Sequence, residues 1–458
     1  MKKVFIKSYG CQMNHYDSER MLESLTPLAF QQTESVEEAD MVILNTCHIR
    51  EKAADKLFSD LGRLNQLKNR RQQQGHKTVL TVAGCVAQAE GEEIQKRAPY
   101  VDIVIGPQAY HRLPQILETP AYQNADEKIS TLGVVDTEFP IESKFDHLPK
   151  NRSKTNVSAF LTIQEGCDKF CTFCVVPYTR GAESSRPVSD IVKEAQQLVS
   201  NGAQEIILLG QNVNAYHGIA EKNAESWGLA RLLYELAEID GLRRLRYTTS
   251  HPLDMGDDLI KAHGKIDVLM PYLHLPVQSG SNRILKLMNR RHNTNDYERV
   301  INQLRSIRPD IAVSSDFIVG FPGETDQDFK ETLAFVNKIG YAQAFSFKYS
   351  ARPGTPAATH DHQVDEIVKD RRLQELQALL DQQQHDFNQK IVGQIIPVLF
   401  EKTSRYDHQI QGRSPYMQLV HAIATNELIG HIRNVRVDLA HPHSLVGTLQ
   451  PVSSGYTG

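Results

Sequence analysis

The sequence lacks the features that place a chain in a membrane or in a disulfide scaffold. No apolar run approaches the roughly 20 residues that a membrane-spanning helix needs. The start, Met-Lys-Lys-Val-Phe-Ile-Lys-Ser-Tyr-Gly, holds no apolar stretch long enough for a signal peptide. Only six cysteines occur in 458 residues, which in a cytosolic chain indicates metal binding rather than disulfides. We therefore expect a cytoplasmic protein with no membrane partner.

A net basic charge and internal repetition are also missing. The formal net charge is −4, which is weak evidence against nonspecific binding to nucleic acid, although a local basic patch is compatible with it. No repeat of the solenoid type occurs. Apolar residues make up 40% of the chain and charged residues 23%, which are ordinary values for a globular enzyme.

Three of the cysteines stand in one short segment, Cys167-Asp-Lys-Phe-Cys171-Thr-Phe-Cys174. Soft thiolates clustered at this spacing favour an iron–sulfur cluster or zinc. A closed structural zinc site takes four ligands, and no fourth cysteine lies nearby. Three cysteines on a cube of four irons leave one iron open to a small molecule. A zinc knuckle that borrows a His or an Asp from elsewhere is the alternative.

The other three cysteines, Cys11, Cys47 and Cys85, each follow a short β-like run and precede a helical pattern. Strands that alternate with helices predict a parallel sheet, and ligands collect at the carboxyl ends of such strands. We therefore expect these thiols to emerge at one edge of one sheet and to hold a second cluster with an open iron. Three buried structural cysteines are the alternative, because free cysteine is often buried.

The patterns along the chain predict three α/β or β domains. Residues 1–120 form a Rossmann-like α/β domain, and the polar, aperiodic stretch 121–152 reads as a linker. Residues 153–386 hold six βα units, which indicates an open, partial (βα)6 barrel with its chemistry at the strand ends. Five short strands within 388–452 predict a small OB-like β-barrel.

The two cysteine sets, their order and the terminal barrel resemble the methylthiotransferase family of radical S-adenosylmethionine (SAM) enzymes. The resemblance covers nearly the whole chain, and it implies that the central barrel is a radical SAM core and the last domain an RNA-binding TRAM domain. The matching motifs are Gly10-Cys11-Gln12-Met13-Asn14, Asn45-Thr46-Cys47, Gly84-Cys85, the Cys167 triad with Val176-Pro177-Tyr178-Thr179-Arg180-Gly181, Leu209-Gly210-Gln211-Asn212-Val213, Ser250-His251-Pro252, His274-Leu275-Pro276-Val277-Gln278-Ser279-Gly280-Ser281, Gly320-Phe321-Pro322-Gly323-Glu324-Thr325 and Ser350-Ala351-Arg352-Pro353-Gly354-Thr355.

The family implies two [4Fe–4S] clusters and SAM as cofactors. The Cys167, Cys171 and Cys174 cluster would chelate SAM through its open iron and cleave it to a 5′-deoxyadenosyl radical. The cluster on Cys11, Cys47 and Cys85 would carry or supply sulfur, which a second SAM methylates. No catalytic residue beyond the cluster ligands is expected. The residues that the resemblance places near SAM are Phe173, Gly210, Gln211, Asn212, His274, Gln278 and Ser279.

Those SAM contacts have plain structural alternatives. Phe173 stands where the family packs an aromatic ring against the adenine, and Gly210-Gln211-Asn212 follows the second barrel strand. The alternative for the latter is an ordinary βα turn. His274, Gln278 and Ser279 end a later strand, and internal hydrogen bonding within the core is an equal interpretation for them.

The branches of the family differ in substrate: a ribosomal-protein aspartate, N6-threonylcarbamoyladenosine in tRNA, or N6-isopentenyladenosine at position 37 of tRNA. The run Ile49-Arg50-Glu51-Lys52-Ala53 resembles the third branch, as does the Gly10 motif with Asp17-Ser18 after it. His48 and Ala182 replace the more usual residues, but neither is a predicted iron ligand. The resemblance therefore implies methylthiolation of C2 of that adenine in the anticodon loop, an unactivated C–H position that a radical route suits.

Competing hypotheses are the same chemistry on the other two substrates, or an iron–sulfur electron carrier or RNA-binding protein without turnover. A flavodoxin or ferredoxin is the expected reductant. Arg180 would pair with a carboxylate or phosphate or lie in a surface pair. Glu324 and Thr325 would serve the site or cap the next helix, and His251 beside Pro252 is predicted to be a turn residue.

Overall fold

The computed structural model divides into two compact units. It describes residues 1–47, 53–119, 133–140, 142–149, 152, 156–221 and 224–451. Most of the branch-specific run at 49–53, the first part of the predicted linker at 121–132, and the predicted domain ends at 153 and 452 lie outside the described residues. The first unit comprises Met1–Ser153, Glu165–Asp168 and Val175–Glu183, and the second comprises Lys154–Gln164, Lys169–Cys174 and Ser184–Gly458.

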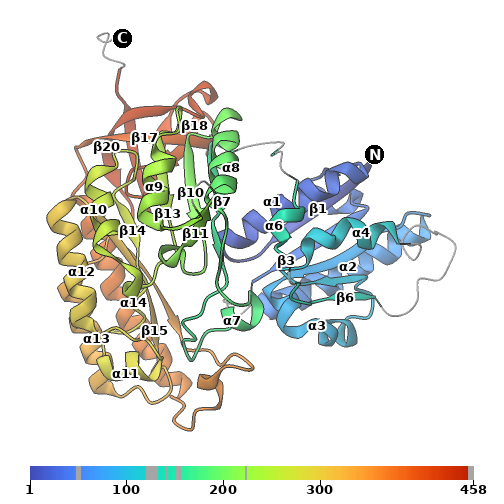
Figure 1. The fold of residues 1–458 in the computed structure, drawn as a ribbon, viewed down its shortest axis with the longest axis horizontal. Helices are drawn as coiled ribbons and strands as arrows, with labels where there is room; N and C mark the ends of the chain where they lie inside the picture. Colours follow the sequence, from blue (N-terminus) through green and yellow to red (C-terminus); the bar gives the residue numbers. More distant parts are fainter. Residues whose placement is uncertain are drawn as a thin grey trace. The chain divides into compact units, whose positions relative to one another are not determined.

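A six-stranded parallel sheet is the centre of the first unit (Figure 1). Its order is β2-β1-β3-β4-β5-β6, and every pairing is parallel. Strand β3 reads Met-Val-Ile-Leu-Asn-Thr and is buried throughout, as expected of a strand covered on both faces. The strands are β1 (Lys2–Ser8), β2 (Phe30–Gln32), β3 (Met41–Thr46), β4 (Val79–Gly84), β5 (Ile103–Ile105) and β6 (Val134–Asp136).

Helices cover both faces of this sheet. Val42 and Leu44 of β3 pack in one apolar cluster with α2 and α3, whereas Met41 and Ile43 pack in another with α1 and α4. Successive strand residues point to opposite faces, so one strand serves two cores. The Rossmann-like α/β prediction is confirmed. The helices are α1 (Gln12–Leu25), α2 (Ala53–Gln73), α3 (Cys85–Arg97), α4 (Leu113–Glu118), α6 (Lys144–His147) and α7 (Val176–Thr179).

One boundary in this unit differs from the sequence expectation. The predicted linker at 121–152 contains β6, which pairs with β5, and α6, so its second half belongs to the first domain. A three-residue strand is too short to show a period in the sequence.

Six parallel strands form the scaffold of the second unit. They make two three-stranded sheets, β7-β10-β13 and β14-β15-β16. Backbone hydrogen bonds from Leu245 N to Val268 O (2.7 Å) and from Met270 N to Leu245 O (3.0 Å) join the sheets in chain order. The predicted partial barrel is confirmed. The strands are β7 (Ser158–Thr162), β10 (Glu205–Leu209), β13 (Arg244–Tyr247), β14 (Tyr272–His274), β15 (Ala312–Val319) and β16 (Gln343–Lys348).

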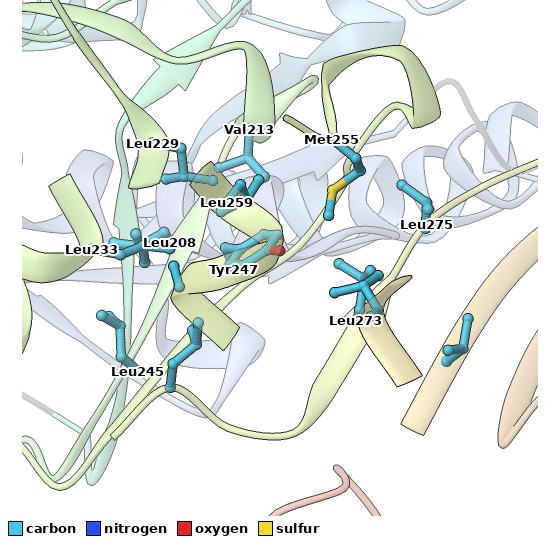
Figure 2. Packing of buried hydrophobic residues seen from close by; sticks show 14 of the residues in the cluster. Leu208, Val213, Leu229, Leu233, Leu245, Tyr247, Met255, Leu259, Leu273 and Leu275 are labelled. Carbon is cyan, nitrogen blue, oxygen red and sulfur yellow. The ribbon is translucent and has the colours of Figure 1, made fainter. Parts of the chain in front are cut away.

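One large apolar core joins these strands to the helices outside them. Figure 2 shows part of it, where Leu208 and Leu245 of the strands lie among Leu229, Leu233 and Leu259 of the helices. In the described part of the chain, no helix is both long and apolar enough to cross a membrane. The helices are α8 (Val188–Ser200), α9 (Leu229–Ala237), α10 (Asp257–Lys265), α11 (Asn282–Leu287), α12 (Thr294–Ile307), α13 (Asp326–Ile339) and α14 (Glu366–Gln389).

A closed five-stranded barrel, β17-β18-β19-β21-β20, ends the second unit and confirms the predicted terminal domain. Two buried arginines of β13 attach it to the core. Arg244 donates to the carbonyls of Arg413 and Pro397, each at 2.8 Å. Arg246 donates to the carbonyls of Ser414 and Pro415 and pairs with Glu205 at 2.7 Å. The strands are β17 (Ile395–Thr403), β18 (Gln409–Arg413), β19 (Leu419–Ile423), β20 (Ile432–Ala440) and β21 (Ser444–Leu449).

Candidate functional site

Cys11, Cys47 and Cys85 follow three adjacent strands of the first sheet. Cys11 follows β1 and is the N-cap residue of α1, Cys47 comes directly after β3, and Cys85 follows β4 as the first residue of α3. Strand β3 pairs in parallel with both β1 and β4. The carboxyl ends of neighbouring parallel strands meet at one edge of a sheet, so the three cysteines lie together at that edge.

The thiols of Cys11 and Cys47 are in direct contact. A hydrogen bond with Cys47 raises the pKa of the Cys11 thiol well above its usual range, and burial is the second cause of this rise. Gly10 makes the approach possible. Its φ is +104°, and a Cβ built there would lie 2.3 Å from Cys47 Cβ and 2.9 Å from its Sγ. Only glycine fits at that position, because it tolerates the dihedral and has no side chain to collide.

Arg180 is buried beside the third cysteine. Burial raises the pKa of the Cys85 thiol, and the positive charge of Arg180 partly opposes that rise. The guanidinium itself is held by Nη2 donating to Asp17 Oδ2 at 2.7 Å and Nη1 donating to Glu165 Oε1 at 3.2 Å. Burial opposes its charge, but Asp17, Cys85 and Glu165 together raise the pKa of Arg180 well above its usual range.

Lys144 completes a buried group of two cations and two carboxylates. Its Nζ donates to Glu165 Oε1 at 2.6 Å and to Pro107 O at 3.0 Å, and it lies 3.5 Å from Asp17 Oδ1. Arg180, Lys144, Asp17 and Glu165 are each at most 4% exposed. We call these four residues the buried charge group. Such charges are stable away from water only when they are paired and hydrogen-bonded.

The residues at this edge fit an iron–sulfur cluster. Three soft sulfur donors converge there, and the charge of the buried Arg180 acts on one of them. Among the described residues, no three His, Cys, Asp or Glu side chains converge tightly enough to hold a single metal ion. A four-iron cube places its cysteines on different irons, and so it sets them further apart than one ion does. Three thiolates at neighbouring strand ends are a donor set that such a cube accepts.

The second cysteine set is divided between the units. Cys167 belongs to the first unit, where its backbone N donates to Gly181 O at 3.3 Å. Cys171 and Cys174 belong to the second unit, and a turn joins Cys174 N to Cys171 O at 3.0 Å. Arg290, which is 7% exposed, donates from Nη1 to Cys171 Sγ at 3.7 Å. A buried arginine thus accompanies a cysteine in each set.

Phe173 packs with its ring partly buried against an apolar cluster that includes Met288, Phe321 and Tyr349. The turn at Gly210 is held by the protein itself. Gln164 Oε1 accepts from the backbone N of Gln211 at 2.9 Å and of Asn212 at 3.0 Å. A Cβ on Gly210 would lie 2.5 Å from that same oxygen, so packing alone accounts for the glycine.

The three candidates near the end of β14 differ in their surroundings. His274 is partly exposed, with Nδ1 3.0 Å from Ser314 Oγ and its ring edge-to-face with Phe345. Gln278 adopts a φ of +79°, which a side chain rarely does. Ser279 is fully buried, and its hydroxyl contacts Thr332 and accepts from Ser281 N. That hydroxyl forms hydrogen bonds within the protein, whereas His274 and Gln278 remain candidates for contacts with a ligand.

Sequence reasoning missed several charged residues around the cysteines. Lys144 and Arg290 carried no signal. For Arg180 the expected pairing with a carboxylate is confirmed, because it pairs with Asp17 and Glu165, and the alternative of a surface pair is wrong because the side chain is buried. Glu165 stands two residues before Cys167, a placement that suggested no role. At the other motifs, Thr325 caps α13 as predicted, whereas Glu324 accepts from Gly320 N and Arg372 instead of capping. His251 is the predicted turn residue, since its Nδ1 accepts from Leu253 N.

Comparisons with known proteins match two successive parts of the chain and one relative over nearly all of it. A family model described as "Uncharacterized protein family UPF0004" matches residues 3–106, and one described as "Radical SAM superfamily" matches residues 161–336. A tRNA-2-methylthio-N(6)-dimethylallyladenosine synthase from Agrobacterium fabrum strain C58 is 59% identical over 448 residues, which are 97% of this chain and 96% of that relative.

Two solved structures share the fold at low identity. The radical SAM methyltransferase TsrM from Kitasatospora setae gives a TM-score of 0.55 at 13% identity, covering 78% of this chain and 75% of that chain. The cobalamin-dependent radical SAM enzyme OxsB gives a TM-score of 0.52 at 13% identity, covering 83% of this chain and 56% of that chain.

Proposed function

The chain belongs to the tRNA-2-methylthio-N(6)-dimethylallyladenosine synthase family of radical SAM enzymes, and on that premise we propose its reaction in residue detail. It is a methylthiotransferase that adds a methylthio group to C2 of N6-isopentenyladenosine at position 37 of tRNA. The observation that carries this function is the 59% identity over 97% of the chain. Its cofactors include SAM and a [4Fe–4S] cluster, as radical SAM enzymes require.

We assign that cluster to Cys167, Cys171 and Cys174. When bound, it supplies the electron that cleaves SAM to a 5′-deoxyadenosyl radical, which can attack an unactivated C–H bond. Arg290 orients Cys171 through its 3.7 Å hydrogen bond. Phe173, the Gly210-Gln211-Asn212 turn, His274 and Gln278 are our candidates for holding SAM. Ser279 supports that region from inside the core.

We assign a second [4Fe–4S] cluster to Cys11, Cys47 and Cys85. When bound, it supplies the sulfur that becomes the methylthio group. Gly10 leaves room for Cys47 beside Cys11, and the buried charge group fixes the side of the site next to Cys85. The convergence of three thiols at one sheet edge supports this assignment.

The RNA must present its base outside the stack, as other base-modifying enzymes require. Bases in single-stranded loops are the easiest to extrude, which suits an adenosine in the anticodon loop. The terminal barrel is our candidate for an RNA contact, by resemblance to TRAM domains. We place the reaction in the cytoplasm, with a flavodoxin or ferredoxin as the electron donor.

Mass spectrometry of nucleosides from an anaerobic reaction tests the function. The reaction contains reconstituted enzyme, SAM, a chemical reductant and two tRNAs, one isopentenylated and one threonylcarbamoylated. We expect the methylthio product only from the isopentenylated tRNA. A product only from the other tRNA would keep the chemistry and overturn the substrate. Release of 5′-deoxyadenosine without any methylthio product would overturn the methylthiotransferase assignment.

Two cysteine variants separate the roles of the two sets. Cys171→Ala should abolish both 5′-deoxyadenosine and the methylthio nucleoside. Cys85→Ala should retain 5′-deoxyadenosine release but yield no methylthio nucleoside. Equal losses of both products in the two variants would contradict the division of labour, and a Cys85→Ala enzyme with normal product would remove Cys85 from the ligands.

A further inference from the structure

The last strand of the partial barrel, β16, carries two exposed aromatic rings on one face. Phe345 is 44% exposed and Phe347 is 47% exposed. They stand two residues apart in the strand, so their side chains leave the same face of the sheet. A single exposed apolar side chain is ordinary on a protein surface, whereas adjacent aromatic rings form an apolar patch of the kind that marks a binding site.

This face is the one opposite the helices. The intervening residues of β16 point towards α14, because Ala344 packs on the large apolar core and Lys348 Nζ lies 3.1 Å from Glu366 Oε2. Side chains alternate along a strand, so Phe345 and Phe347 point away from α14. The two rings therefore belong to the inner side of the partial barrel.

The neighbouring strands give each ring different surroundings. In the parallel register of β15 and β16, Asp316 lies opposite Phe345 and Ile318 lies opposite Phe347. His274 of β14 extends the polar end, since its Nε2 lies 3.4 Å from Asp316 Oδ2 and its ring packs edge-to-face with Phe345. We call these five residues the inner aromatic face. It has a polar end at His274 and Asp316 and an apolar end at Ile318 and Phe347, with Phe345 between them.

The inner aromatic face adjoins the residues that are our candidates for holding SAM. His274 is one of these candidates, and Ile318 packs on the same apolar cluster as Phe173, which is another. All three belong to the second unit. A substrate on this face would lie next to the group from which the 5′-deoxyadenosyl radical forms. Attack on a C–H bond requires such proximity.

We propose that the inner aromatic face binds the modified base of the tRNA, with Phe347 and Ile318 against the isopentenyl group and Phe345 stacked on the adenine. The inference rests on the proposed function and deepens it by naming the residues that select the isopentenylated base. The isopentenyl group is a branched hydrocarbon chain without a polar atom, so it matches the apolar end. The adenine is planar with a polar edge, so it matches an aromatic ring beside His274 and Asp316.

SAM is the competing occupant, because it also contains an adenine. Its methionine part carries an amino group, a carboxylate and a positively charged sulfur, and none of these groups gains from contact with Ile318 and Phe347. The apolar end of the face therefore favours the RNA base over SAM, and the two occupants predict different effects of the same substitution.

The test is the binding of two tRNAs to the reconstituted enzyme under anaerobic conditions, without reductant so that no turnover occurs. One tRNA carries the isopentenyl group on adenosine 37, and the other carries the unmodified adenosine. We expect the parent to bind the isopentenylated tRNA at least about tenfold more tightly, since apolar contacts discriminate on this scale. Phe347→Ala should abolish most of this preference by weakening the isopentenylated tRNA alone. Phe347→Leu keeps an apolar side chain and should retain most of it.

Two further variants separate base stacking from general effects on the fold. Phe345→Ala should weaken both tRNAs equally, by about tenfold, because stacking on the adenine does not depend on the isopentenyl group. Tyr234 of α9 is 40% exposed on a helix outside the partial barrel. Tyr234→Ala is the matched control and should change neither affinity. Since all these rings are partly exposed, each variant should keep the circular dichroism of the parent.

Four results would overturn the proposal. Phe347→Ala could bind both tRNAs as the parent does, or it could weaken both equally. It could also lose affinity for SAM while keeping the preference between tRNAs, which would make SAM the occupant of the face. The fourth result is a parent that binds both tRNAs equally. That result is distinguishable from failure of the proposed function, which is judged by methylthio product in the mass-spectrometry assay of the parent.

Discussion

Gly10→Ala should remove the second cluster and spare the first, because of one interatomic distance. The added Cβ would lie 2.3 Å from Cys47 Cβ, whereas ordinary contacts begin at 3.4 Å. Cys47 would therefore have to retreat by about 1 Å. Metal–ligand distances tolerate only about 0.2 Å, so a retreat of that size breaks the coordination of Cys47 outright.

The same substitution also strains the backbone, and a second glycine isolates that effect. Gly10 has a φ of +104° and Gly75 a φ of +82°. Alanine at either position should cost on the order of 1–3 kcal/mol in backbone strain. A Cβ at Gly75 meets nothing within 4 Å. Gly75→Ala therefore reproduces the strain without the collision and serves as the matched control.

Three measurements on anaerobically reconstituted enzyme check this prediction: iron per chain, release of 5′-deoxyadenosine and yield of methylthio nucleoside. Gly10→Ala should hold about half the iron of the parent, because one coordination sphere is lost. It should still release 5′-deoxyadenosine but make no methylthio product. Gly75→Ala should match the parent in all three. Normal iron content and product in Gly10→Ala, or equal defects in both variants, would refute the reasoning.

Three further predictions follow from the second unit. Burial lowers the pKa of His263 from the ordinary 6.5 to about 3. Between these two values the unfolded chain binds a proton at this residue and the folded chain does not. The free energy of unfolding should therefore fall by about 1.4 kcal/mol per pH unit as the pH drops from 6.5 towards 3. His263→Gln should remove that part of the stability loss between pH 7 and pH 5 in denaturant titrations, whereas substitution of the exposed His360 by Gln should not. Equal slopes of unfolding free energy against pH in the parent and both variants would contradict the assignment. Arg246→Ala leaves Glu205 buried without the arginine of its ion pair and should cost about 3–5 kcal/mol of unfolding free energy. A loss under about 1 kcal/mol would show that the pair contributes no more than a surface ion pair. Arg290→Gln removes the donor to Cys171 and should slow 5′-deoxyadenosine release about tenfold, as loss of a charge-assisted hydrogen bond implies; its exposed neighbour Arg291→Gln is the control, and equal rates in the two would leave Arg290 without a role.

The three-part architecture followed from local pattern, and the structure confirms it. Short apolar runs before Cys11, Cys47 and Cys85 predicted parallel strands, because alternating strand and helix periods leave few other folds. The placement of the cysteines after strands did not reveal which strands are neighbours. The insertion of β1 between β2 and β3 depends on pairing between segments far apart in the chain, and no local period encodes that order.

The candidate SAM contacts show where motif reasoning stops. The sequence marks Gly210 and Ser279 equally, but the structure shows that Gly210 makes room for Gln164 and that Ser279 bonds within the core. His274 has the same motif status and is partly exposed beside Phe345. Burial separates these residues, and burial depends on the packing of the whole unit.

The sequence by itself predicted which cysteines belong together, since the spacing of Cys167, Cys171 and Cys174 is local and strand ends mark the other three. It also determined the order of the domains and the family. Only the tertiary structure decided which charges surround the thiols. Arg180 meets Asp17 across 163 positions of sequence, and Gly10 is required because Cys47 arrives from another strand. Contacts of this kind join residues that are far apart in the sequence and meet only in the folded chain. Motif spacing and hydrophobic period depend only on residues that are close together in the sequence, so they do not reveal such contacts.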